Sequence, residues 1–71
     1  MNAEVKTLGE ALPEQQARVR KLIGYYREIG PAGQFAIANM EAALRRADQA
    51  AISGDVGAMI QAHEELKGFS E

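Results

Sequence analysis

At 71 residues, with a net charge of −2 and no cysteine, the chain can form one small domain without disulfides. A core of this size is thin, so self-association is a plausible further source of stability. A single histidine without thiols argues against zinc, no stretch nears the ~20 apolar residues of a membrane span, and the negative charge disfavours nucleic acid as a partner. We therefore expect a cytoplasmic protein with no metal and no cofactor.

Residues 1–12 are expected to form an N-terminal arm, which is either flexible or a short helix that lies on a partner subunit. Three of its apolar residues keep a helical spacing in phase with the segment that follows, namely Val5, Leu8 and Leu12. Pro13 suits the first position of a helix, where its missing N–H needs no partner. The first helix is therefore predicted over 13–29.

This first helix has an apolar stripe and a basic face. The stripe consists of Val19, Leu22, Ile23, Tyr26 and Ile29. The basic face carries Arg18, Arg20, Lys21 and Arg27. That face is either an ordinary solvated surface or, in a protein that binds nucleic acid, the strip that binds it.

A long alanine-rich helix is predicted over 31–53, directly after Gly30. Glycine can end one helix and Pro31 can begin the next, so the first two helices should form a tight hairpin or corner. Small residues along the second helix would let another helix approach closely. We expect a homodimer or higher oligomer whose interface includes Ala36, Met40, Ala43, Leu44, Ala47 and Ala50. A second apolar stripe, with Phe35 and Ile52, suggests burial on more than one side.

The third helix is predicted over 56–67. Gly54 ends the preceding helix, and Asp55 is a favourable N-cap. Its buried residues are expected to be Val56, Met59, Ile60, His63 and Leu66. Together the three segments predict an all-α fold in which residues 13–71 form a single helical domain and assemble as an oligomeric bundle.

The sequence contains no catalytic signature. His63 lies on the apolar side of the third predicted helix, and no acid, nucleophile or second metal ligand stands at a helical spacing that would reach it. It is therefore interpreted as a partly buried or interface residue. We expect no enzymatic activity, no catalytic residue and no metal ligand.

The start of the second helix, GPAGQ, is the candidate ligand site. A helix N-terminus attracts anions, and Gly33 would let one approach closely. A nucleotide-like anion could then be held by Tyr25, Tyr26, Arg27, Gly33, Gln34, Asn39 and Arg45. The alternative is that Gly33 merely lets the first helix or a partner pack tightly against it.

Three stretches, LPEQQARVRKLI, EIGPAGQFAIANMEAALRRAD and SGDVGAMIQAHEELKGF, resemble small helical proteins encoded by bacteriophages and prophages. The resemblance spans nearly the whole chain and implies a context of phage and host, but no activity and no functional residue. Small phage accessory proteins commonly act by binding.

We therefore expect a non-catalytic interaction protein that counters or modulates a host process, such as host defence. It would bind a host protein or sequester a small anionic nucleotide signal. The alternatives are a structural or DNA-packaging accessory protein and a nucleic-acid-binding regulator.

Overall fold

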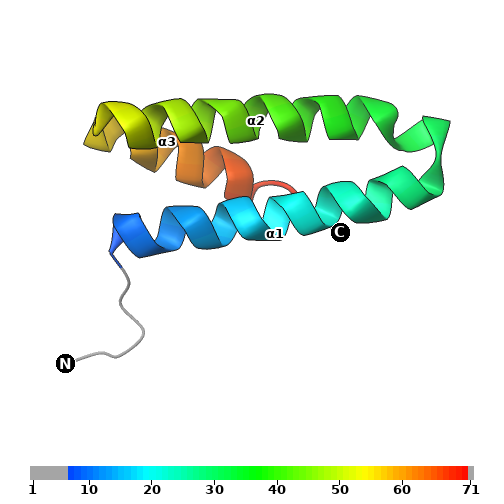
Figure 1. Cartoon of the computed structure of the whole chain (residues 1–71), viewed down its shortest axis with the longest axis horizontal. Helices are drawn as coiled ribbons and strands as arrows, with labels where there is room; N and C mark the ends of the chain where they lie inside the picture. Colours follow the sequence, from blue (N-terminus) through cyan, green and yellow to red (C-terminus); the bar gives the residue numbers. More distant parts are fainter. Residues whose placement is uncertain (1–6, 71) are drawn as a thin grey trace.

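The computed structural model describes residues 7–70, which form three α-helices and one short 3₁₀ helix. Helix α1 spans Leu8–Ile29, η1 spans Pro31–Gly33, α2 spans Gln34–Ser53 and α3 spans Val56–Lys67. The two long helices run antiparallel as a hairpin, and the shorter α3 lies beside only part of their length (Figure 1). The all-α prediction is confirmed.

Helix α1 begins at Leu8, five residues before the predicted start at Pro13. The hydroxyl of Thr7 accepts a hydrogen bond from the backbone N–H of Glu10 at 3.2 Å and donates one to the Glu10 carboxylate at 3.1 Å. These bonds cap the helix start. Pro13 therefore lies inside α1, where its ring is exposed, and residues 8–12 belong to the helical domain. The earlier residues of the predicted arm, 1–6, lie outside the described residues.

Both predicted breaks occur at glycines with positive φ. Gly30 has φ of 96° and Gly54 has φ of 70°, values that favour glycine over residues with a side chain. After the second break the carboxylate of Asp55 accepts a hydrogen bond from the N–H of Ala58 at 3.2 Å, as expected of an N-cap. The starts of α2 and α3 thus follow from local backbone chemistry, although the first turn after Gly30 is 3₁₀ rather than α-helical.

The core lies between the three helices and combines large side chains with alanines. Helix α1 contributes Leu12, Val19, Leu22 and Ile23; α2 contributes Met40, Ala43, Leu44, Ala47 and Ala50; α3 contributes Ala62 and Leu66. The alanines of α2 let the helices approach closely, because their side chains are short. Phe69, after the end of α3, packs against the same core.

The alanine face of α2 is therefore not the oligomer surface that the sequence suggested. Five of the six predicted interface residues, all except Ala36, are buried within one chain, and Ala36 itself packs against that core. Helices α1 and α3 of the same chain cover them. A second subunit could reach these side chains only if the bundle opened.

Several residues of the predicted apolar faces are instead on the surface, among them Ile29 of α1, which is 61% exposed. Phe35 is 78% exposed and Ile52 is 86% exposed, so α2 buries one side rather than two. On α3, Val56 and Ile60 are also more than half exposed, because Ala62 and Leu66 supply its buried side.

One partly buried polar contact ties α1 to α2. The side-chain amide of Gln16, which is buried, donates a hydrogen bond of 2.7 Å to the Asp48 carboxylate. We expect Gln16→Ala to lower the free energy of unfolding by about 1–2 kcal/mol, because a hydrogen bond to a charged acceptor is lost. Urea denaturation of this variant, of Asp48→Ala and of the double variant measures the coupling, which is zero if the bond adds nothing. Gln49→Ala, at an exposed position on α2, is the control.

Candidate functional site

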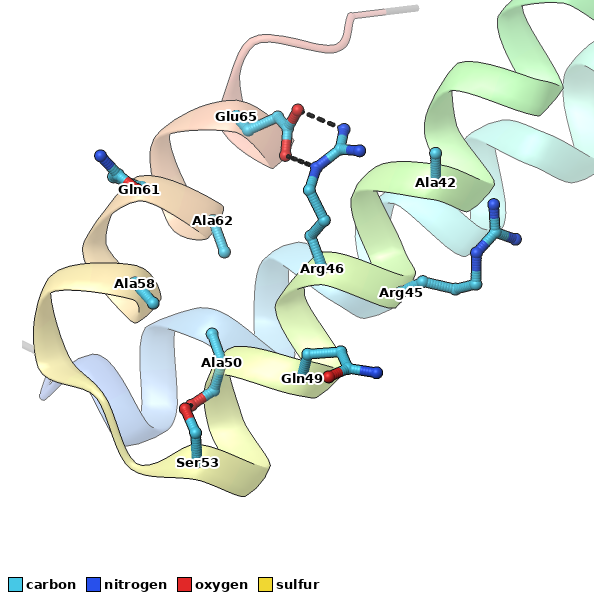
Figure 2. Close-up of a pocket in the computed structure, with 10 residues that line it drawn as sticks. All are labelled: Ala42, Arg45, Arg46, Gln49, Ala50, Ser53, Ala58, Gln61, Ala62 and Glu65. Carbon is cyan, nitrogen blue, oxygen red and sulfur yellow. Dashed lines mark hydrogen bonds and ion pairs between the residues drawn. The ribbon is translucent and has the colours of Figure 1, made fainter.

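An open groove of about 910 Å³ lies between α2 and α3. Its lining comprises Ala42, Arg45, Arg46, Gln49, Ala50, Ser53, Ala58, Gln61, Ala62 and Glu65 (Figure 2). The groove is open because the alanine side chains that line it are short, and polar and charged side chains surround it. The groove thus has room for a ligand but contains neither a nucleophile paired with a base nor a metal-binding group of side chains.

An ion pair crosses this groove. The guanidinium of Arg46 donates two hydrogen bonds to the Glu65 carboxylate, one of them 3.0 Å long from Nε (Figure 2). These hydrogen bonds and the charge of Glu65 raise the pKa of Arg46 above its ordinary value. The neighbouring Arg45 points away from α3 in the same view and has no hydrogen-bond or ion-pair partner between residues 7 and 70. The charge of Arg46 is therefore paired within the chain, whereas Arg45 is free to contact solvent or a ligand.

Gly33 packs against α1 and offers no space to an anion. It is buried, and a Cβ atom built on it would overlap the carbonyl oxygen of Tyr26 and lie 3.3 Å from the Tyr26 Cβ. Its own N–H donates to the carbonyl of Gly30 at 2.9 Å. A carbonyl oxygen repels anions, so the packing interpretation of Gly33 describes the structure and the anion-binding interpretation does not.

The structure also separates the other residues of the predicted ligand site. Tyr25 and Tyr26 line a small apolar hollow with Leu22 and Ile29, whereas Arg45 lines the α2–α3 groove.

Arg27 forms an ion pair with Glu41 of α2, with 3.7 Å between Nη2 and Oε2. Gln34 and Asn39 are exposed on α2. Since Tyr25 and Arg27 are two residues apart on a helix, they point to opposite sides, and no single pocket contains the predicted set.

His63 is partly buried on α3, as the sequence suggested. Its Nδ1 lies 3.8 Å from the Glu64 carboxylate, so an acidic group does reach it, contrary to the expectation from helical spacing. The same imidazole is not aimed at either of the hollows described above.

Sequence reasoning missed the two exposed apolar regions at opposite ends of the molecule. The corner patch, where α1 turns into α2, comprises Tyr25, Ile29 and Phe35. The turn patch, where α2 turns into α3, comprises Ile52, Val56 and Ile60. Helical periodicity places Tyr25 off the apolar stripe of α1, which predicts its exposure, but the other five residues fit apolar stripes that would also suit a core.

Within residues 7–70, no helix is long and apolar enough to cross a bilayer, and no three potential metal-ligating side chains come together. No known protein family, curated protein or solved structure matches this chain at a significant level. Any function must therefore be argued from the surface itself.

Proposed function

We propose that this chain is a non-catalytic interaction protein that acts by binding another protein. One observation carries the proposal: among residues 7–70, six large apolar side chains are more than half exposed, against seven that form the core together with the alanines. Exposed apolar regions on a small domain mark interaction sites more often than chance exposure. If the chain is phage-encoded, as its resemblance suggests, the partner is a host protein whose activity it counters or modulates.

The turn patch is the surface proposed for this partner. Val56 and Ile60 are one turn apart on α3 and therefore share a side of the helix, and Ile52 lies on the last turn of α2. Acidic residues flank them, since Asp55 directly precedes Val56 and Glu64 lies one turn beyond Ile60. An apolar centre with a charged rim is the usual composition of a protein interface. The partner surface should thus be apolar with a basic rim.

The proposal is tested by affinity capture with the full chain. We expect wild type to retain a specific protein from a lysate of the host cell, and Val56→Gln combined with Ile60→Gln to lose it. The control is Ala17→Gln, an exposed substitution on α1 that adds the same side chain. Binding should weaken as salt rises, because the rim contact is electrostatic.

Two results would contradict this assignment. Retention of the same protein by wild type and by the turn-patch variant would exclude this surface. If no protein is retained and a nucleotide is extracted from the purified chain, the function would be sequestration of a small anion.

A further inference from the structure

The corner patch continues a face of the α1–α2 hairpin that α3 covers only in part. Helix α3 has 12 residues and the two long helices have 22 and 20, so α3 is roughly 18 Å long beside helices of about 30 Å. Figure 1 shows two helices without a third near the α1–α2 corner. At one end of the hairpin, α1, α2 and α3 therefore form a three-helix bundle, and at the other end only α1 and α2 pack together.

Contacts at the end of α3 locate the boundary between the covered and open halves. Arg18 donates a hydrogen bond of 2.8 Å to the carbonyl of Leu66, near the last turn of α3. On α1, residues at intervals of three and four beyond Arg18 share its side, and they include Tyr25 and Ile29. The α1 part of the corner patch thus lies on the side that faces α3, beyond the point where α3 ends.

On α2, the corner patch also lies on the side that faces α3, beyond the end of that helix. Arg46 reaches Glu65 of α3, and residues at the same helical spacing toward the corner are Ala42, Asn39 and Phe35. The C-terminal segment extends past α3 as far as Tyr26, whose hydroxyl donates to the carbonyl of Ser70 at 3.2 Å. Beyond that contact, no described residue covers the exposed ring of Phe35.

We propose that a second copy of this chain covers the corner patch, so that the open halves of two hairpins pack face to face about a two-fold axis. In this arrangement the α1–α2 hairpin of each copy packs against the half of the other hairpin that α3 does not cover. Because α3 lies at the far end of each hairpin, it stays clear of the contact. The arrangement is self-complementary, as a two-fold interface requires.

The charge of the patch suits contact with itself. A two-fold axis brings like groups together, so a charged patch would repel its copy. Tyr25, Ile29 and Phe35 carry no charge, and nearby Arg27 is neutralised by Glu41 within the same chain. A nucleic acid or an acidic peptide would find no free cation within the patch itself.

The exposed area of the corner patch supplies more than half of what a weak dimer needs. The three side chains are 51%, 61% and 78% exposed, and since an aromatic side chain buries about 150–250 Å², together they offer roughly 350 Å² per copy. Two copies would bury about 700 Å² from these side chains alone, against the ~1,200 Å² at the lower end of specific interfaces. Polar neighbours such as Gln34 and Asn39 can supply much of the rest. The expected dissociation constant is on the order of micromolar.

Sedimentation equilibrium of the full chain, from micromolar to millimolar concentration, tests this proposal. We expect a monomer–dimer equilibrium whose dissociation constant rises at least about tenfold in Ile29→Gln combined with Phe35→Gln, a loss of about 1.4 kcal/mol. The matched control, Val56→Gln combined with Ile60→Gln, replaces the turn patch and should leave the equilibrium unchanged. Circular dichroism of the dilute variants should show the wild-type helix content, because all four positions are exposed.

Three outcomes would overturn the proposal. These are a wild-type chain that stays monomeric at millimolar concentration, growth beyond a dimer, and a dimer that the turn-patch variant dissociates while the corner-patch variant does not. Since the proposed protein partner binds the turn patch, loss of that binding and loss of self-association are separate results.

Discussion

Replacing Gly33 by alanine is expected to lower the free energy of unfolding by about 3 kcal/mol, at the upper end of the usual cost of overpacking. The φ of Gly33 is −87°, so alanine could adopt the backbone conformation without strain. The cost arises because the new Cβ would overlap the Tyr26 carbonyl, which belongs to the backbone of α1 and cannot rotate away. The corner between α1 and α2 would have to open.

Gly24→Ala is the matched control. Gly24 lies inside α1, is exposed, and has no other residue's atoms within 4 Å of the position a Cβ would take. Alanine is the better helix former, so this change should raise stability by about 0.5–1 kcal/mol. Urea denaturation of the two variants compares the effects directly. Similar changes in both would show that Gly33 is not packed against α1.

Leu66→Ala is expected to cost about 2–5 kcal/mol, as for other large-to-small changes in a core. Leu66 is completely buried and is the largest buried side chain of α3, whose other buried residue is Ala62. Small domains have total stabilities of about 0.05–0.15 kcal/mol per residue, so the loss is a large share of the whole. Thermal denaturation followed by circular dichroism should show a much lower midpoint.

The comparison for this prediction is Ile60→Ala on the same helix. Ile60 is half exposed, so its truncation removes little buried surface and should change the free energy of unfolding by less than about 1 kcal/mol. Equal effects at Leu66 and Ile60 would mean that α3 is not held by the face described here.

Local signals in the sequence were enough to predict three helices and the start of α3, whereas the predicted start at residue 31 is the 3₁₀ turn η1 and α2 begins at Gln34. Gly30, Gly54 and Asp55 act through their own backbone conformation or a hydrogen bond three residues away, which a sequence displays directly. The start of α1 was wrong because Pro13 was treated as the beginning. The Thr7 and Glu10 pair, spaced as in a capping box, was the signal that could have located it.

Predictions that depended on tertiary packing were less successful. The alanines of α2 could have faced another subunit or the helices of the same chain, and periodicity does not distinguish the two. The candidate ligand site shows the same ambiguity: the sequence shows that Gly33 lacks a side chain, but not that the Tyr26 carbonyl fills the space. Exposure of Val56 and Phe35 depends on where α3 ends relative to the hairpin, which no local pattern encodes.

The attachment of α3 to α1 has a consequence for the order of folding. Arg18 and Leu66 are 48 residues apart in sequence, whereas the ion pair between Arg27 and Glu41 closes a loop of only 14 residues. Closing a long loop costs more chain entropy, so the α1–α2 corner and the α2–α3 hairpin, whose Arg46–Glu65 pair is 19 residues apart, can form before α1 and α3 meet. In the native state α3 contributes two buried residues against five each from α1 and α2, so we expect its amide hydrogens to be the first of the three helices to exchange with solvent.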